Sequence, residues 1–214
     1  MRPVACMITA PIAGAAEADA LVRRIQAVVH AGAHLVQIRQ PQLDAAALAQ
    51  IVKRAVRASE GFAARILVNE RVDVALAAGA HGVHLRGDSV PAARVRDVVP
   101  AGFVIGRSVH SASEALAAER IGGLDYLLFG TVFATDSKPR VVPAGVDMLA
   151  TVCHAVALPV LAIGGMTPST LAPVARAGAA GYAAIGLFAH AAIDALPQVI
   201  QSAASAFDMP ERVP

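Results

Sequence analysis

Eight short apolar runs recur along this chain, and each is followed by an alanine-rich segment with apolar residues at helical spacing. Near-continuous apolarity is typical of parallel strands buried on both faces, and segments such as 20–29 and 48–56 indicate the helices between them. Eight such units close naturally into a (β/α)₈ TIM barrel with eight parallel strands, an α/β fold. The runs are residues 4–9, 34–39, 65–69, 82–85, 103–109, 126–130, 159–165 and 181–186.

Helix-end signals agree with these units. Ser111 and Glu114 have the spacing of a capping box, and Thr167 precedes Pro168 as a capping residue precedes a first-turn proline. Glycines stand where helices should end, at Gly32, Gly79, Gly122 and Gly178. The chain of 214 residues is near the short end for such a barrel, roughly 200 to over 400 residues. We therefore expect a single domain over residues 1–214.

Composition excludes several classes of function. The net charge is +2, aromatic residues make up 4%, and no lysine or arginine run is present, which argues against a nucleic-acid partner. No apolar run approaches the ~18 residues needed to cross a bilayer, and the N-terminus lacks the layout of a signal peptide. Two cysteines in apolar surroundings, Cys6 and Cys153, indicate reduced core residues rather than a disulfide framework. We expect a cytoplasmic protein without membrane association.

The barrel fold predicts that residues at the carboxyl ends of the strands carry the chemistry. Gln37 and Arg39 alternate along one strand, so their side chains point the same way, and an arginine there can grip phosphate oxygens with two nitrogens. Pairing of Arg39 with a helix carboxylate is the alternative. Ser108 and His110 alternate in the same manner, and His110 is a candidate proton donor or acceptor.

Three loops could bind anions or metal ions. Gly164 and Gly165 end the seventh run and Gly186 ends the eighth, where barrels of this type commonly bind phosphate, although such glycines also serve tight turns. Asn69-Glu70 and Asp88 could form an oxygen-rich Mg²⁺ site or could cap helices. Lys138 lies in the long loop 131–146 and could cover a bound anion or remain a solvated surface lysine.

Taken together, the motifs resemble the thiamine-phosphate synthase superfamily, which includes the thiazole tautomerases (TenI proteins). The resemblance rests on MIT near the start, VQIR, LVNERVDVALAAGAHGVHL, IGRSVHS, DYLLFGTVFATDSK and PVLAIGGMTPSTL. It implies a small, usually oligomeric barrel enzyme that acts on phosphorylated pyrimidine and thiazole molecules. In the synthase reaction, hydroxymethylpyrimidine diphosphate loses pyrophosphate and the thiazole phosphate nitrogen captures the pyrimidine.

The resemblance also implies roles for individual residues. Glu70 and Asp88 would be the Mg²⁺ carboxylates, and Gly165 and Gly186 the thiazole-phosphate cradle. Ser108, Lys138 and His110 are the candidate catalytic side chains, and His110 is included for its position on the strand rather than from the resemblance. The contacts to pyrophosphate or pyrimidine would be Gln37, Arg39, Asn69, Ser108, Thr135, Ser137 and Lys138.

The chain departs from the synthase pattern at Pro41, where a lysine is usual, at Glu70, where an aspartate is usual, and at Arg86, where a glycine is usual. The serine common in the last phosphate loop is absent from residues 184–187, and Thr131 replaces the histidine that tautomerases use. Three functions therefore stay open. Synthase chemistry is favoured, thiazole tautomerisation is second, and a non-catalytic, regulatory phosphate-binding barrel is third.

Overall fold

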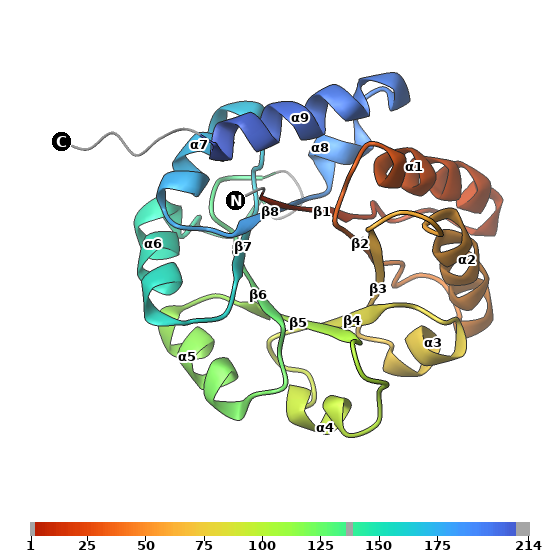
Figure 1. Cartoon of the computed structure of the whole chain (residues 1–214), viewed down its shortest axis with the longest axis horizontal. Helices are drawn as coiled ribbons and strands as arrows, with labels where there is room; N and C mark the ends of the chain where they lie inside the picture. Colours follow the sequence, from red (N-terminus) through yellow and green to blue (C-terminus); the bar gives the residue numbers. More distant parts are fainter. Residues whose placement is uncertain (1–2, 136–138, 209–214) are drawn as a thin grey trace.

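A computed structural model describes residues 3–135 and 139–208 of the chain. Its eight strands are all parallel and close into a barrel in chain order (Figure 1). This architecture confirms the predicted (β/α)₈ fold. The strands are β1 (Val4–Ile8), β2 (Leu35–Ile38), β3 (Arg65–Asn69), β4 (Gly82–Leu85), β5 (Val104–Val109), β6 (Tyr126–Gly130), β7 (Val160–Ile163) and β8 (Gly181–Ala184).

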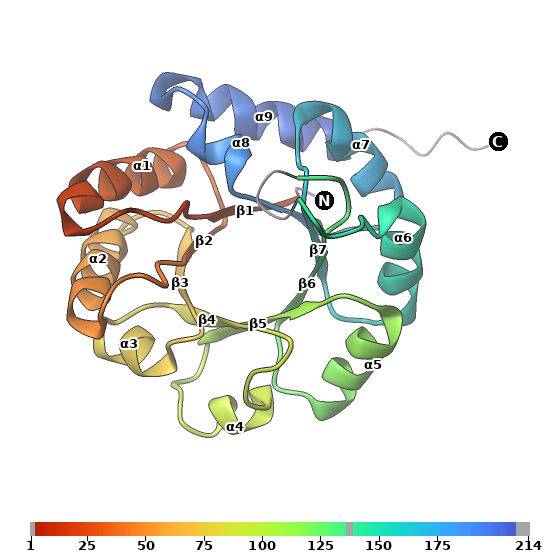
Figure 2. The same ribbon diagram turned by 180° about the vertical axis from the view of Figure 1, so that it is seen from behind.

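Helices surround the barrel in both end-on views (Figures 1 and 2). None of those in the described part of the chain is both long and apolar enough to cross a membrane. They are η1 (Ala15–Glu17), α1 (Ala18–His30), α2 (Ala45–Ala58), α3 (Val72–Ala77), α4 (Ala92–Arg96), α5 (Ala112–Ile121), α6 (Gly145–Ala155), α7 (Pro168–Arg176), α8 (Gly186–Ala189), η2 (Ile193–Ala195) and α9 (Leu196–Phe207).

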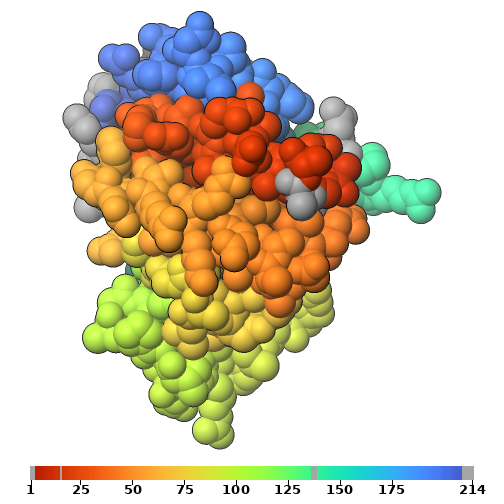
Figure 3. All heavy atoms as spheres, turned by 90° about the vertical axis from the view of Figure 1, so that its right-hand side faces the viewer, coloured from red at the N-terminus to blue at the C-terminus, as the bar shows by residue number. Residues whose placement is uncertain are grey.

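The first and last strands pair with each other where the barrel closes. Strand β8 pairs with β1 in parallel, with Gly181 opposite Val4. Figure 3 shows the red N-terminal helical region lying between the blue C-terminal helices and the orange region of α2. The last helix, α9, packs on both α7 and α1, so the outer layer closes at the same place as the sheet.

Seven of the eight strands contribute to two separate apolar cores because successive side chains point to opposite faces, whereas the inward positions of β4 are Gly82 and His84. Met7 on β1 belongs to the large core between strands and helices. Its neighbours Cys6 and Ile8 belong to a smaller core that includes Leu67, Tyr126 and Leu128 and fills the barrel interior. This double burial explains why the strands are apolar throughout rather than alternating.

The predicted strand ends coincide with the observed ends at β3, β4, β5 and β6, and lie one or two residues too late at β1, β2, β7 and β8. Strand β2 ends at Ile38, so Arg39 is the first residue beyond it, and β8 ends at Ala184, so Gly186 begins α8. The predicted helix-ending glycines all have positive φ values: 98° at Gly32, 69° at Gly79, 77° at Gly122 and 85° at Gly178. Their prediction is confirmed, because this backbone region favours glycine.

The predicted capping box of α5 forms only in part. Ser111 Oγ accepts a hydrogen bond from the Glu114 amide at 3.1 Å, as expected. The Glu114 carboxylate, however, accepts from the His110 amide at 2.8 Å rather than from the amide of Ser111. Glu114 therefore holds the backbone of His110, the residue before the N-cap, in place beside the barrel rim.

We expect Gly106→Ala to destabilise the barrel strongly. A Cβ atom at this position of β5 would lie 2.0 Å from Cζ of Tyr126, whose buried ring fills the space beside Gly106. Overpacking of this kind typically costs about 1–3 kcal/mol. The measurement is urea unfolding, with Gly14→Ala as the control because nothing lies within 4 Å of a Cβ there. Equal unfolding free energies for the two variants would contradict the packing argument.

Candidate active site

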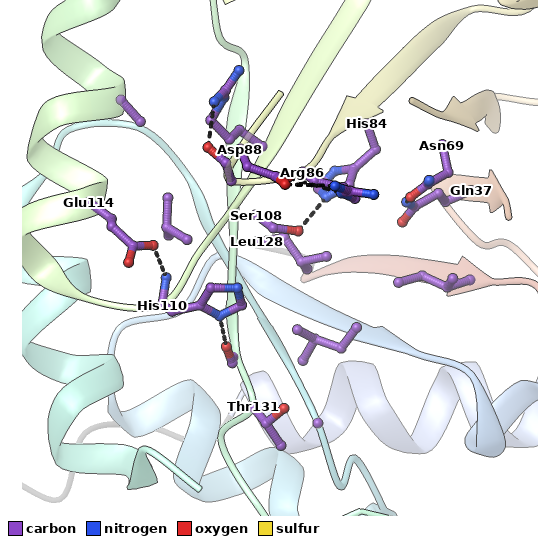
Figure 4. A pocket seen from close by; sticks show the side chains of 18 of the residues that line it. Gln37, Asn69, His84, Arg86, Asp88, Ser108, His110, Glu114, Leu128 and Thr131 are labelled. Atoms are coloured by element: carbon purple, nitrogen blue, oxygen red, sulfur yellow. Dashed lines mark hydrogen bonds and ion pairs between the residues drawn. The ribbon is translucent and has the colours of Figure 1, made fainter. Parts of the chain in front are cut away.

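A cavity of about 820 Å³ opens at the carboxyl ends of the strands. Predicted site residues that line it are Gln37, Arg39, Asn69, Asp88, Ser108, His110 and Thr135. Figure 4 labels five of these, namely Gln37, Asn69, Asp88, Ser108 and His110. Glu70, Gly165 and Gly186 are not among the lining residues, although Gly164 and Ile185 are. Ser137 and Lys138 lie outside the described residues. Most of the site residues predicted from the sequence therefore lie at one cavity.

Two amide side chains form one side of the cavity floor. Gln37 Nε2 donates a hydrogen bond to Asn69 Oδ1 at 2.9 Å, from neighbouring strands β2 and β3. Gln37 is only 2% exposed, and its Oε1 atom has no hydrogen-bond partner among the described residues. A buried carbonyl oxygen without a partner is costly, so this atom is suited to accept an N–H or O–H from a ligand.

A hydrogen-bonded chain of three side chains forms the centre of the floor. Tyr126 Oη lies 2.9 Å from His84 Nδ1, and His84 Nε2 lies 2.8 Å from Ser108 Oγ. Ser108 faces the cavity, whereas His84 is 1% exposed. Burial, together with the charge of Arg107, lowers the pKa of His84 to about 3, so the ring is neutral at physiological pH.

Neither His84 nor Tyr126 is among the candidate site residues from the sequence. The missing information was the register between strands. His84 lies opposite Gly106, which in turn lies opposite Tyr126, so the glycine leaves space for the histidine and tyrosine side chains to meet. The sequence signal was limited to a histidine within one predicted strand and a glycine within the next, without the register that pairs them.

The loop after β4 is held by charged side chains that bind its backbone. Arg107 donates to the carbonyl oxygens of Gly87 at 3.0 Å, Ser89 at 3.3 Å and Val90. Glu70 Oε1 accepts from the Arg86 amide at 2.5 Å and from Ser89 Oγ at 2.5 Å. This use of Glu70 resembles the capping alternative from the sequence, in which the carboxylate holds a loop rather than a ligand.

Asp88 and Arg86 form an ion pair at the cavity rim. Their side chains are joined by hydrogen bonds of 3.0 and 2.7 Å, and both are more than half exposed. The hydrogen bonds from Arg86 lower the pKa of Asp88, which keeps the carboxylate ionised. Asp88 therefore faces the cavity as a carboxylate that is already paired with a guanidinium group.

Arg39 lies at the rim of the cavity, where the sequence left open a pairing with a helix carboxylate. Its exposed side chain lines the cavity and makes no hydrogen bond or ion pair within residues 3–135 and 139–208. The alternative of a structural ion pair is thus not realised among those residues. A guanidinium group that lines a cavity without a carboxylate partner is available for an anionic ligand.

His110 lines the cavity near Thr131 (Figure 4). Its Nδ1 atom lies 2.5 Å from the carbonyl oxygen of Gly130. A carbonyl only accepts, so Nδ1 carries the proton, and in the neutral ring Nε2 is left as an acceptor. The side chain can therefore exchange a proton with a ligand through Nε2.

The two glycines after β7 have a packing role that the sequence did not reveal. A Cβ at Gly164 would lie 2.5 Å from Thr131 Cγ2, and a Cβ at Gly165 would lie 2.5 Å from the Ala134 carbonyl oxygen. Both have positive φ values, 103° and 65°. These glycines allow the loop after β6 to approach β7 closely, and phosphate binding there stays a prediction.

A closed parallel barrel, with a cavity at its strand ends that holds several polar side chains, is the construction of TIM-barrel enzymes. The chain belongs to the thiamine monophosphate synthase family, whose model matches residues 5–188. This finding confirms the resemblance inferred from the motifs.

Individual relatives agree with this assignment. The chain is 41% identical to a thiamine-phosphate synthase from Methanoculleus marisnigri over 72% of this chain and 73% of that protein. It is 38% identical to a thiamine-phosphate synthase from Coprothermobacter proteolyticus over 77% of this chain and 78% of that protein. The solved thiamine phosphate pyrophosphorylase from Pyrococcus furiosus superimposes with a TM-score of 0.78 at 30% identity, covering 93% and 96% of the two chains.

Proposed function

We propose that this chain is a thiamine-phosphate synthase, which joins hydroxymethylpyrimidine diphosphate to thiazole phosphate and releases pyrophosphate. The observation that carries the proposal is a cavity lined by the hydrogen-bonded Gln37–Asn69 pair and by the Arg39 guanidinium, which has no carboxylate partner within residues 3–135 and 139–208, in a chain of this family. In the reaction, the bond between the pyrimidine methylene carbon and the diphosphate oxygen breaks. The lone pair of the thiazole nitrogen then forms the new carbon–nitrogen bond.

This reaction needs stabilisation of charge more than removal of a proton, because no proton leaves the reacting atoms. We assign Arg39 to the oxygens of the departing diphosphate, with Thr135, Ser137 and Lys138 added from the resemblance. Gln37 Oε1 would accept a hydrogen bond from the pyrimidine, and Ser108 would contact the reacting region. Gly165 and Gly186 would bind the thiazole phosphate, as the family pattern implies.

Mg²⁺ is part of the expectation from the family, and when bound it would neutralise charge on the diphosphate. The two carboxylates assigned to it do not fit this role as they lie. Both oxygens of Glu70 accept from Ser89 Oγ, at 2.5 and 2.6 Å, and Asp88 is paired with Arg86. Residues 3–135 and 139–208 contain no group of three histidine, cysteine or acidic side chains placed to hold a metal ion. We therefore assign no step to a metal.

Inorganic pyrophosphate should bind the purified protein even in excess chelator. Arg39 lines the cavity and supplies positive charge without a metal ion, whereas the charge of Arg86 is already paired with Asp88. Isothermal titration calorimetry measures the affinity with EDTA and with added Mg²⁺. Added Mg²⁺ should strengthen binding less than Arg39→Ala weakens it. Binding that occurs only with Mg²⁺ would restore Glu70 and Asp88 as metal ligands.

Thiazole tautomerisation is the second candidate, and the position of His110 favours it. Its Nε2 atom is the acceptor left beside the cavity once Nδ1 donates to the Gly130 carbonyl, so the ring could move a proton on a bound thiazole. Thr131, at the position of the tautomerase histidine, cannot take this role because its hydroxyl is a very weak base.

One assay separates the candidate functions. Purified protein is incubated with hydroxymethylpyrimidine diphosphate and thiazole phosphate, and thiamine phosphate is measured by chromatography. A parallel incubation with thiazole carboxylate phosphate follows the tautomer by NMR. Product in the first reaction supports the synthase, and turnover only in the second supports the tautomerase. Binding without turnover in either would leave the non-catalytic, regulatory barrel.

We also propose, from the sequence and the family, a single-domain cytoplasmic homo-oligomer that does not bind nucleic acid or membranes. The cysteines support a reducing environment. Cys6 and Cys153 are both free thiols, and burial raises the pKa of Cys6 to about 12 and that of Cys153 to about 11. Thiols that stay protonated in this way are poor nucleophiles.

A further inference from the structure

The three-residue chain Tyr126–His84–Ser108 has a direction that can be worked out from its partners. Tyr126 Oη has one hydrogen-bond partner among the described residues, His84 Nδ1 at 2.9 Å. Burial raises the pKa of Tyr126 well above its usual value of 10, so the phenol keeps its proton. If Nδ1 carried the histidine proton and donated it to Tyr126, the phenol proton would have no acceptor in this buried site.

The favoured arrangement runs the other way. Tyr126 donates its proton to Nδ1, and the neutral His84 ring must then carry its own proton on Nε2. Nε2–H donates to Ser108 Oγ at 2.8 Å. One of the two acceptor positions of the serine oxygen is thereby occupied, and the hydroxyl proton can point into the cavity that Ser108 lines.

We propose that Tyr126 and His84 are positioning residues that make Ser108 a dedicated hydrogen-bond donor toward an oxygen of a bound diphosphate. A serine hydroxyl can normally donate or accept, and its rotation costs little. Here the buried chain restricts that freedom before the ligand arrives, because His84 already donates to the serine oxygen, so the ligand meets a hydroxyl that is biased toward donating. The direction of the chain is independent of the proposed reaction, whereas the choice of a diphosphate oxygen rests on the proposed function.

The direction can be observed by ¹⁵N NMR of protein labelled at histidine. The His84 signals are assigned by their loss in His84→Gln. We expect a neutral ring with the proton on Nε2 near pH 7. In Tyr126→Phe this preference should be lost, because Nδ1 no longer has a donor. A wild-type ring with the proton on Nδ1, or a doubly protonated ring, would overturn the proposed direction whatever reaction the protein catalyses.

The consequence for binding is measured with inorganic pyrophosphate by calorimetry. Ser108→Ala and Tyr126→Phe should each weaken binding, by about tenfold for the loss of a hydrogen bond to a charged group. The double variant should bind no more weakly than Ser108→Ala alone, because Tyr126 acts through the serine.

Tyr182→Phe is the matched control. Tyr182 is also a buried tyrosine on a barrel strand, but its hydroxyl has no hydrogen-bond partner among the described residues. Removing that hydroxyl should change neither the histidine signals nor pyrophosphate affinity. Additive losses in the double variant, or equal behaviour of Tyr126→Phe and Tyr182→Phe, would overturn the positioning role. If the NMR result stands while pyrophosphate affinity does not change in Ser108→Ala, the diphosphate assignment is wrong and the direction of the chain is retained.

Discussion

Arg39→Lys should lower kcat/KM for thiamine phosphate formation by about ten- to hundred-fold, because a hydrogen bond to a charged group contributes about 1.5–3 kcal/mol. Lysine keeps the positive charge but loses the planar group that can bind two phosphate oxygens at once. Arg39 lines the cavity, directly after β2. Steady-state kinetics and pyrophosphate titration should report losses of similar size.

Arg23→Lys on α1 is the control, because Arg23 is also exposed and is not among the residues that line the cavity. Both variants should melt at nearly the wild-type temperature, since neither side chain is buried. Unaltered kinetics in Arg39→Lys would show that a single positive charge at this position is enough for the reaction. The proposed contact of Arg39 with two phosphate oxygens would then be wrong.

Folding stability should fall steeply when the pH is lowered below about 6.5, because of His84. In the folded chain burial lowers the pKa of His84 from 6.5 to about 3. The unfolded chain therefore binds a proton at pH values where the folded chain does not. Stability is complete above the unfolded pKa and is lost as the pH falls, at up to about 1.4 kcal/mol per pH unit from this residue.

Urea unfolding at a series of pH values measures this effect, and the slope matters more than the absolute stability. His84→Gln removes the titrating ring, so its stability should depend less on pH between about 4 and 6 than that of the wild type. His81 contributes in the same direction in both proteins, because burial and the charge of Arg65 lower its pKa as well. Parallel slopes for the two proteins would mean that His84 accepts a proton in the folded state.

The sequence predicted the residues at the strand ends well, because one rule governs them. Alternation along a strand places Gln37 and Arg39, or Ser108 and His110, on a common side, and parallel strands bring all these sides to one rim. The cavity lining confirms that these four residues meet. No knowledge of neighbouring strands was needed for this prediction.

Features that depend on neighbouring segments were missed or misjudged. The Tyr126–His84–Ser108 chain requires the register of β4, β5 and β6, which a single sequence does not provide. Gly164 was interpreted as an approach to phosphate, but its missing side chain first makes room for Thr131. Glu70 has a side chain that could bind a metal ion. Only its contacts with Ser89 and the Arg86 amide show that it holds the loop after β4.

The contacts of the loop after β4 have an evolutionary consequence. Arg107 donates to three carbonyl oxygens there, and Glu70 accepts from the Arg86 amide. Most of these contacts are therefore made to main-chain atoms, which do not depend on the side chains of the loop. Substitutions of Arg86 or Asp88 can then accumulate without displacing the loop. Descendants of this chain could thus acquire new ligand preferences through single changes at the rim, while two residues elsewhere in the barrel preserve the path of the backbone.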